Sequence, residues 1–360
     1  MKKAVFIINS LQNGGAERVV ATQANYLAKK GIDVTVIFLR NWMLYDLRPE
    51  VHTVYLSRQK EFSPISYLTK IIPLVIKLNH VLDGIFREGE VILMTSNLLF
   101  PDIITRLSRY SEKTIYVHHS HQQIVPYSRN RIYKWFIRWL YGKQKIVCVG
   151  KQVEEELREF YHLRQDTIKF IWNPIDFDLI KKKMEEPLEF PRPYILFCSR
   201  MIPEKHPDWV IRAFSDGGFY RKYQLVLLGV GKMAKNLKGL AKDLGVESSV
   251  CFAGWETNVY KWMKNASLFV HCADKESLGL VVLESLYCGC PVVAVRSPGP
   301  VQIMRGELQR YLCETSVKAL EEKMREAING YPENLRQYMP DCSVEASTEN
   351  YVETYRAWKE

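Results

Sequence analysis

The sequence has no apolar run long enough to cross a membrane. A membrane-spanning helix needs about 20 consecutive apolar residues. The longest apolar region here, residues 65–86, is interrupted by Lys70, Pro73, Lys77 and His80, so we expect no transmembrane segment. The start, MKKAVFIINS, has a short basic segment and a short apolar run, and it indicates a first β-strand rather than a signal peptide.

The sequence also lacks the regular cysteine spacing of a disulfide framework. Most of its eight cysteines lie in apolar runs such as KIVCVG and YILFCSR, where a small buried side chain fits. The CGC segment at 288–290 has one intervening residue, which is poor geometry for a disulfide and favours close helix packing. We therefore expect reduced, buried thiols, as in a cytosolic protein.

Positive charge is concentrated in one half of the chain. Residues 1–172 contain 25 Lys and Arg against 15 Asp and Glu, whereas residues 173–360 contain 25 of each. The net charge of +10 therefore belongs to the first half. Such a basic surface favours an anionic partner, either nucleic acid or the cytoplasmic leaflet of a membrane.

Short apolar runs alternate with helical patterns in both halves of the chain, without internal repeats or low-complexity segments. The runs are AVFIIN, DVTVIFL, VILMTS, TIYVHHS and KIVCVG, then YILFCS, QLVLLG, VCFAG, SLFVHCA and PVVAV. This rhythm predicts parallel sheets covered by helices on both faces. We expect two doubly wound α/β domains, with a linker in the proline-punctuated stretch 173–193. In the tail, Tyr351, Tyr355 and Trp358 have helical spacing and predict a terminal helix that docks on a domain.

Two motifs follow predicted strands of the first half. Gly14 and Gly15 lead from the first strand into a helix, where glycines permit close backbone approach and the helix start attracts phosphate. The alternative is a strand-to-helix turn that requires positive φ. In VHHSHQQ, the histidines at 118, 119 and 121 end a strand. A metal cluster or a structural role is possible, but strand-end placement without adjacent carboxylates or thiols favours contact with a substrate.

Two further motifs follow predicted strands of the second half. Arg200 and Lys205 lie after the strand YILFC, and two cations at one strand end suit a diphosphate. Taken alone, this motif fits two solvated loop charges better. In ESLGLVVLE, a loop carries Glu276 and a helix is expected to begin near residues 277–279. Backbone N–H groups at that start suit phosphate. Glu284 then lies on the second turn, where its carboxylate suits ligand hydroxyls.

In this order, these motifs, together with NPID at 173–176 and GVG at 229–231, resemble family 4 of the retaining glycosyltransferases, which have the GT-B fold. The resemblance covers essentially the whole chain. It implies an acceptor-binding domain of residues 1–172 with 343–360, whose terminal helix crosses back, and a donor-binding domain of residues 173–342.

The resemblance also assigns roles to residues. It places Arg200 and Lys205 on the diphosphate of a nucleotide-sugar, Glu284 on the ribose and Glu276 near the sugar hydroxyls. A strand-end histidine contacts the sugar, here assigned to His119 with His118 and His121 as register alternatives. The remaining donor-site positions are Gly15 (near phosphate or acceptor), Gly229, Ser277, Leu278, Gly279 and Leu280.

The resemblance implies transfer of a hexose or N-acetylhexosamine, most simply from a UDP-sugar, to a lipid-linked glycan acceptor of surface polysaccharide or lipopolysaccharide synthesis. Anomeric retention without a protein nucleophile is expected, because the departing phosphate can deprotonate the acceptor on the same face. No cofactor or metal is expected. The enzyme is expected to act in the cytoplasm, peripherally on the inner face of the cytoplasmic membrane.

Two segments depart from the pattern of the family, and a third imitates a motif of a different glycosyltransferase fold. The strand before Arg200 ends in CSR rather than in glycines, and the loop RSPGPVQIM lacks the acid often found there, so the donor's identity is left open. The segment DFD at 176–178 imitates a metal-binding Asp-x-Asp motif. Its place before a helical run predicts turn and N-cap roles instead.

The segment RNRIYKWFIRWLYGK combines apolar residues at helical spacing with basic residues. The apolar set is Ile132, Trp135, Phe136, Trp139 and Leu140. A basic amphipathic helix with tryptophan suits an anionic membrane surface. The alternative is a core-facing helix with a solvated basic side. The basic first half favours membrane contact.

Three other functions were weighed. A sugar-nucleotide 2-epimerase has the same fold but needs no acceptor, and the Glu276–Glu284 motif with the basic surface favours transfer. A nucleic-acid-binding protein fits the pI near 9.0, but no recognised binding motif is present. A nicotinamide dehydrogenase requires a dinucleotide fingerprint that the first strand–helix turn lacks.

Overall fold

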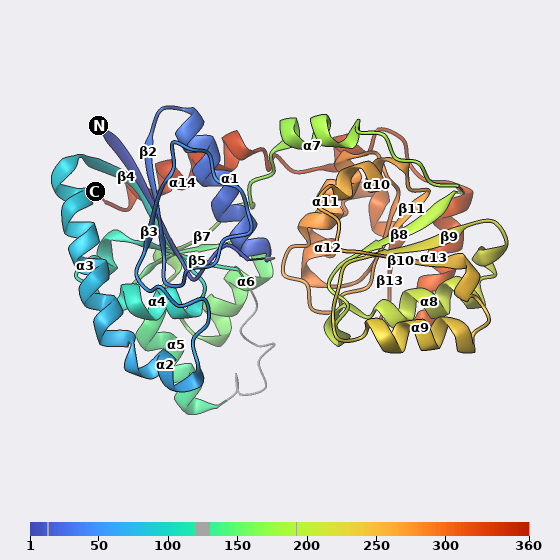
Figure 1. The fold of residues 1–360 in the computed structure, drawn as a ribbon, viewed down its shortest axis with the longest axis horizontal. Coiled ribbons are helices and arrows are strands. Elements are labelled where there is room, and N and C mark those ends of the chain that lie inside the picture. The colour runs from blue at the N-terminus through green and yellow to red at the C-terminus, as the bar shows by residue number, and fades with distance from the viewer. Residues whose placement is uncertain (13, 120–129, 192, 360) are drawn as a thin grey trace. The chain divides into compact units, whose positions relative to one another are not determined.

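A computed structural model describes residues 1–12, 14–119, 130–191 and 193–359. The chain divides into two compact units (Figure 1). The first comprises Met1–Ile175 with Asp341–Glu360, and the second comprises Asp176–Pro340. Each unit has its own parallel β-sheet with helices around it.

The sheet of the first unit has seven strands, all parallel to their neighbours. In spatial order the strands are β3 (His52–Tyr55), β2 (Asp33–Phe38), β1 (Lys2–Ile8), β4 (Glu90–Asn97), β5 (Ile115–His118), β6 (Lys145–Cys148) and β7 (Ile168–Phe170). The central strand β1 is buried at every position except its first, as expected for a strand covered on both faces. The strand order reverses between β1 and β4.

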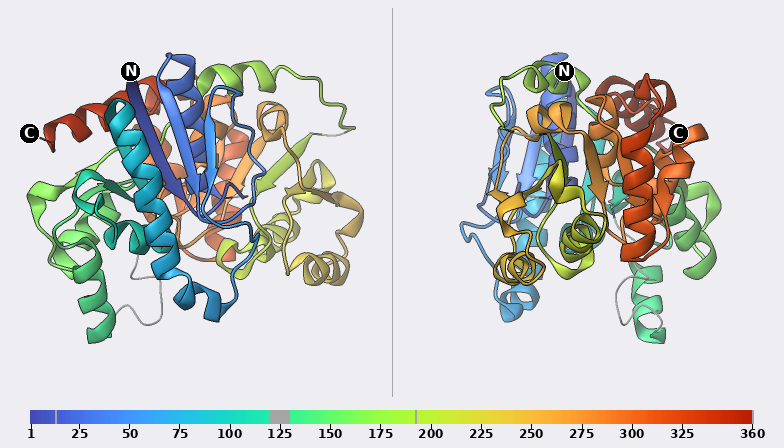
Figure 2. Two further views of the ribbon diagram at one scale, coloured as in Figure 1. Left: turned by 60° about the vertical axis from the view of Figure 1, so that its left-hand side comes forward. Right: turned by 90° about the vertical axis from the view of Figure 1, so that its right-hand side faces the viewer.

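Helices between the strands, and one C-terminal helix, complete the first unit. They are α1 (Gly15–Lys29), α2 (Pro64–Thr69), α3 (Ile71–Glu88), α4 (Leu99–Arg106), α5 (Arg131–Tyr141), α6 (Lys151–Glu155) and α14 (Val344–Ala357). The predicted terminal helix is confirmed as α14, which Ser343 caps through its hydroxyl. Tyr351 and Tyr355 are buried in the core of this unit, and Trp358 packs against it. The tail of the chain therefore completes the first unit (Figure 2).

The sheet of the second unit has six parallel strands. Their spatial order is β10 (Val250–Gly254), β9 (Gln224–Leu228), β8 (Tyr194–Cys198), β11 (Leu268–His271), β12 (Val292–Val295) and β13 (Leu312–Cys313). The helices are α7 (Phe177–Met184), α8 (Pro207–Asp216), α9 (Ala234–Asp243), α10 (Val259–Asn265), α11 (Leu280–Tyr287), α12 (Pro298–Ile303) and α13 (Val317–Asn329). The strand order reverses between β8 and β11.

The predicted fold class of two doubly wound α/β domains is confirmed. The stretch expected to be an irregular linker contains α7, because Asp176 caps that helix by accepting a hydrogen bond from the Leu179 amide at 2.9 Å. The N-cap role predicted for the DFD segment is thereby confirmed. All eight cysteines are free thiols, six of them buried.

The structure divides the apolar residues of α5 between two environments. Leu140 is fully buried, which supports the core-facing alternative at this position, and the partly buried Phe136 and Trp139 pack against the same cluster. Ile132 and Trp135 are 75% and 67% exposed. Within the described residues, no helix is both long and apolar enough to traverse a bilayer.

Candidate functional site

In open parallel sheets, ligands bind at the carboxyl ends of the strands where the strand order reverses. In the second unit this point lies between β8 and β11, which pair directly. The loop after β8 carries Arg200 and Lys205, and the loop after β11 carries Glu276. The fold therefore brings together two motifs that are about 70 residues apart in sequence.

Lys205 and Glu276 form an ion pair across this reversal point. Lys205 Nζ lies 2.6 Å from Glu276 Oε2, and the two side chains are 16% and 20% exposed. Lys205 ends a short 3₁₀ turn, and His206 follows with φ of 45°, which turns the chain into α8. A partly buried, charge-assisted hydrogen bond of this length is stronger than an exposed pair.

His271, the last residue of β11, lies beneath this pair. Its Nε2 is 3.8 Å from Glu276 Oε2, and burial lowers the pKa of His271 to about 4, so the ring is neutral near pH 7. Burial raises the pKa of Glu276, but the positive charge of Lys205 and hydrogen bonds from Lys205 and the Leu278 backbone bring it below its usual value. Glu276 is therefore an ionised carboxylate that accepts hydrogen bonds.

The loop that carries Glu276 is held by the RSPGP segment. The Gly299 amide donates a hydrogen bond to the Glu276 carbonyl oxygen at 2.7 Å, and a Cβ on Gly299 would lie 2.1 Å from the Leu278 carbonyl oxygen. Ser277 and Leu278 are buried. Gly279 has φ of 82° and precedes Leu280, the first residue of α11, whose start has no side-chain cap.

The GVG segment has a similar role beside Arg200. Gly229 has φ of 127°, and a Cβ there would lie 2.0 Å from the Ser199 carbonyl oxygen. The Met201 amide donates to the Val230 carbonyl oxygen at 3.0 Å. Glycine thus lets the loops after β8 and β9 pack together, and the exposed Arg200 lies on the first of these loops.

Glu284 lies on the second turn of α11, as expected, but it is only 1% exposed. The structure therefore places its carboxylate below the surface of the second unit. The ribose contact assigned to Glu284 remains a prediction.

In the first unit the strand order reverses between β1 and β4. Gly15 is the exposed first residue of α1 after β1. Gly14 has φ of −120°, and neither glycine has a positive φ. The alternative of a turn that requires positive φ is therefore wrong. Close approach of a ligand to the backbone at the start of α1 stays a prediction.

His119 follows the end of β5 and bonds to Asn97, the last residue of β4. His119 Nε2 lies 2.9 Å from Asn97 Oδ1. The Asn97 amide nitrogen donates to Ile7 O and Thr95 Oγ1, so its oxygen accepts from the protonated Nε2 of His119. Burial and then the nearby His118 lower the pKa of His119 to about 3. His119 is therefore a neutral ring whose Nδ1 is the acceptor nitrogen.

The other strand-end histidines differ from His119. His118 is buried, and its ring meets that of Tyr141 edge-on at 5.3 Å, so it belongs to the core. His121 lies outside the described residues. Sequence reasoning missed Asn97 and His271 as site residues, although they end the strands β4 and β11, because the contacts that mark them, to His119 and to Glu276, depend on how the following loops fold.

A buried carboxyl group lies next to the His119 site. Asp102 on α4 accepts hydrogen bonds from Ser96 Oγ at 2.6 Å and from Tyr141 OH at 2.7 Å. Burial raises its pKa to about 7 despite these bonds. Since Ser96 precedes Asn97 and Tyr141 ends α5, this network joins α5 to the strand end that contacts His119.

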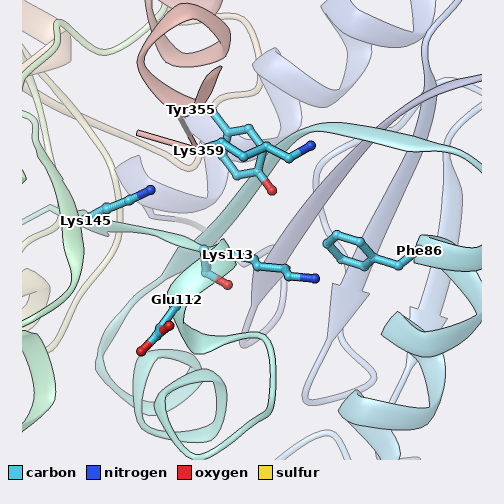
Figure 3. Close-up of a pocket in the computed structure, with 7 residues that line it drawn as sticks. Phe86, Glu112, Lys113, Lys145, Tyr355 and Lys359 are labelled. Carbon is cyan, nitrogen blue, oxygen red and sulfur yellow. The ribbon is translucent and has the colours of Figure 1, made fainter. Parts of the chain in front are cut away.

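A cavity of about 340 Å³ lies at the opposite edge of the same sheet. Thr114 and Lys145, which line it, stand at the amino ends of β5 and β6. The amino groups of Lys113, Lys145 and Lys359 stand apart and do not converge on one point (Figure 3). This cavity is therefore a poor candidate for the site.

Among the described residues, no group of three His, Cys, Asp or Glu side chains could hold a metal ion.

Two glycosyltransferase family models match consecutive parts of the chain. The model of glycosyltransferase family 4 matches residues 13–179, and the model of group 1 glycosyl transferases matches residues 180–341. The chain belongs to this glycosyltransferase family.

Curated relatives of this glycosyltransferase include enzymes of bacterial glycan synthesis. One from Campylobacter jejuni is an N-acetylgalactosamine-N,N'-diacetylbacillosaminyl-diphospho-undecaprenol 4-alpha-N-acetylgalactosaminyltransferase, 28% identical, with 81% of this chain and 80% of the relative covered. Another is the lipopolysaccharide core biosynthesis glycosyltransferase LpsE of Rhizobium meliloti, also 28% identical, with 82% and 79% covered.

Solved structures agree on the fold. The Anabaena protein HepE in complex with UDP has a TM-score of 0.75 at 17% identity, with 99% of this chain and 100% of HepE covered. A glycosyltransferase from Rickettsia africae has a TM-score of 0.75 at 16% identity, with 99% and 98% covered. These likenesses confirm the predicted GT-B fold.

We predict that the stability of the first unit depends on the ionisation of Asp102. An unfolded aspartate has a pKa of about 3.9, against about 7 in the folded chain. Between these values the unfolded state has lost the proton and the folded state keeps it, so stability falls as pH rises through this window. Asp102→Asn removes this titration. From pH 4 to pH 8, the free energy of unfolding measured with denaturant should fall by a few kcal/mol more for the native protein than for the variant, since a shift of one pKa unit corresponds to about 1.4 kcal/mol. Parallel stability curves would contradict it.

Proposed function

We propose that this glycosyltransferase moves a hexose or N-acetylhexosamine from a UDP-sugar to a lipid-linked glycan acceptor, with retention of the anomeric configuration. The observation that carries the proposal is the 2.6 Å ion pair of Lys205 and Glu276 at the reversal point of the second sheet. The pair holds Lys205, a cation that can bind a diphosphate, next to Glu276, a carboxylate that can accept hydrogen bonds from sugar hydroxyls.

The two partners of the ion pair have separate roles in the proposed complex. Lys205 turns to the donor diphosphate together with Arg200, which is exposed on the preceding loop. Glu276 then accepts hydrogen bonds from hydroxyls of the donor sugar, because it is ionised and cannot serve as a general acid near neutral pH. The ion pair pre-orients both groups before the donor binds.

Retention follows from reaction on one face of the sugar. The bond between the anomeric carbon and the β-phosphate oxygen breaks, and the acceptor hydroxyl oxygen bonds to the same face. The acceptor proton passes to the departing phosphate, so no protein nucleophile is required. Arg200, Lys205 and the uncapped start of α11 stabilise the negative charge that grows on the diphosphate. In this scheme the cations of the chain replace a metal ion.

His119 contacts the sugar in this proposal. As a neutral ring with Nε2–H bound to Asn97, it offers Nδ1 as a hydrogen-bond acceptor for a sugar hydroxyl. A neutral group suits an uncharged hydroxyl, whereas an imidazolium would favour the diphosphate. Glu284 is assigned to the ribose, and Gly15 to the phosphate or the acceptor.

The lipid-linked acceptor is inferred from the relatives. The C. jejuni relative is named for a diphospho-undecaprenol substrate, and the R. meliloti relative is named for lipopolysaccharide core biosynthesis. The donor base is inferred from the UDP bound to HepE. Synthesis of a bacterial surface glycan at the inner face of the cytoplasmic membrane is consistent with these substrates.

Helix α5 provides the proposed contact with the membrane. Ile132 and Trp135 are exposed on its first turns. A groove of about 340 Å³ lies beside them, lined by Arg131, Lys134, Trp135, Arg138, Phe160 and His162. Lys134 Nζ lies 3.6 Å from the centre of the Phe160 ring. Cations around an exposed tryptophan suit anionic lipid headgroups.

The first prediction concerns the ion pair. Lys205→Ala and Glu276→Ala should each reduce sugar transfer roughly 10²- to 10³-fold, as expected when one electrostatic stabiliser is removed. Both side chains are partly exposed, so melting temperatures should change little. Lys264→Ala, which removes a lysine paired with Glu185 in the same unit, is the matched control and should keep full activity. Unchanged transfer by folded Lys205 and Glu276 variants would refute both assignments.

The second prediction identifies the donor. UDP and its sugar conjugate should raise the melting temperature, with GDP and ADP much less effective, because a ligand that binds only the folded state stabilises it. The shift should be the same with and without EDTA. Glu284→Ala should reduce the shift for UDP and for its sugar conjugate alike. A shift that EDTA abolishes would overturn the metal-free scheme, and a GDP or ADP preference would overturn the UDP assignment.

The third prediction concerns α5. Changing Ile132 and Trp135 to Ser should reduce sedimentation with anionic vesicles several-fold, because both side chains are exposed and apolar. Trp255, 54% exposed in the second unit, provides the control variant Trp255→Ser, which should sediment like the native protein. Equal sedimentation of all three proteins would exclude α5 from the membrane surface.

A further inference from the structure

His271 combines deep burial with an unpaired polar atom. It ends β11, where every residue is buried, and its side chain is only 3% exposed. Its Nε2 has no hydrogen-bond partner among the residues that the structure describes. Buried polar atoms are normally paired, because an unpaired one gives up its bonds to water without replacement. An apolar side chain would suit this strand better, so the histidine needs another explanation.

The unpaired atom lies next to the Glu276 carboxylate. His271 Nε2 is 3.8 Å from Glu276 Oε2, whereas an N–H···O hydrogen bond needs about 2.7–3.2 Å. A movement of roughly 1 Å would therefore bring the two atoms to bonding distance. Lys205 Nζ binds the same oxygen at 2.6 Å. Oε2 thus has one partner in contact and a second potential partner just beyond reach.

The His271 ring is suited to donate to a carboxylate without adding charge. Burial lowers its pKa to about 4, so the ring is neutral near pH 7 and has one N–H and one acceptor nitrogen. With the proton on Nε2, the ring can donate a charge-assisted hydrogen bond to the ionised Glu276. A neutral donor holds the carboxylate without competing with it for a nearby cation.

The backbone of Glu276 is held independently of Lys205. The Gly299 amide donates to the Glu276 carbonyl oxygen at 2.7 Å. A second contact joins the two loops, because His206 Nε2 lies 3.4 Å from Asp274 Oδ1. If the Lys205 amino group turns away, the loops therefore stay in place and only the Glu276 side chain is released.

We propose that His271 is a positioning residue for donor binding. When Lys205 turns to the diphosphate, His271 Nε2–H donates to Glu276 Oε2 and holds the carboxylate toward the sugar hydroxyls. This inference rests on the proposed function, in which Lys205 meets the diphosphate and Glu276 meets the sugar. A partly buried carboxylate that loses its cation needs another partner. The need is greatest with a sugar bound, because the sugar displaces water that would otherwise solvate Glu276.

The test compares two substitutions of similar shape in the full chain. His271→Gln keeps an N–H donor near the position of Nε2, whereas His271→Met has a similar length and no donor. Calorimetric titration gives dissociation constants for UDP and for its glucose, galactose and N-acetylhexosamine conjugates. For the conjugate that the native protein binds most tightly, His271→Met should raise the constant about tenfold, as expected for one lost hydrogen bond to a charged group.

The same titrations contain the controls. UDP should bind the His271→Met variant as it binds the native protein, because water replaces the sugar beside Glu276, and this binding also shows that the variant is folded. His271→Gln should restore most of the affinity for the conjugate, because it restores the donor.

A double variant tests whether His271 acts through Glu276. Glu276→Ala removes the acceptor of the proposed hydrogen bond. In this background, His271→Met should cause little further change in the affinity for the conjugate, because the effects of two residues that act on one interaction are not additive.

The outcomes separate this inference from the proposed function. Unchanged binding of the conjugate by His271→Met, or equal weakening of UDP and conjugate, would overturn the role of His271 and leave the donor assignment standing. Failure of His271→Gln to restore affinity, or a full additional loss in the Glu276→Ala background, would overturn it as well. If the native protein binds none of the UDP-sugars, the proposed function fails and this inference fails with it.

Discussion

The ion pair of Lys205 and Glu276 depends on the reversal of strand order between β8 and β11. Because these strands pair directly, the loops that leave them are neighbours although 71 positions separate the two residues. Each loop is fixed by a backbone contact that excludes a Cβ, at Gly229 against Ser199 and at Gly299 against Leu278. The position of the two charges is therefore set by backbone packing. A substitution at either glycine would move one charge relative to the other without touching the pair itself.

The two reversal points differ in their electrostatics. In the second unit the side chains that meet are a cation and an ionised carboxylate, with a neutral histidine below them. In the first unit they are the neutral pair of Asn97 and His119, next to a carboxyl group that is protonated over much of the acidic range. Charge suits a diphosphate, and neutral hydrogen-bonding groups suit sugar hydroxyls. This difference fits the proposed roles, in which Lys205 meets the diphosphate and His119 meets a sugar hydroxyl.

The sequence predicted the fold from its buried strands and failed at the sheet edges. Ten apolar runs correspond to β1, β2, β4, β5, β6 and to β8 through β12. The strands β3, β7 and β13 were missed, because β3 is largely exposed and the others have only three and two residues. All three lie at sheet edges, where strands are often short or exposed, whereas the edge strand β10 has five residues and was found through VCFAG.

The site could be predicted only as far as its loops. The motifs located Lys205 and Glu276, but Asn97 became visible only when strand order placed it beside His119. His271 became visible only when the loop after β11 brought Glu276 within 3.8 Å of it. Spacing cannot report burial either. The eight-residue interval to Glu284 placed it correctly on the second turn of α11, yet it did not reveal that this turn faces inward. In α5, helical spacing alone did not separate the buried Leu140 from the exposed Trp135.

The topology that brings the site residues together also determines where the first turns of the helices lie. In a parallel sheet, a helix that connects two strands must begin near the carboxyl edge, since it runs back to the amino end of the next strand. The first turns of α3 and α5 therefore lie at the edge that carries Asn97 and His119. An acceptor anchored in a bilayer presents its sugar close to the headgroups. An enzyme for such an acceptor needs its binding edge, and not the opposite edge, against the membrane. Ile132 and Trp135, exposed on the first turns of α5, fit the proposed approach of such an acceptor to this edge.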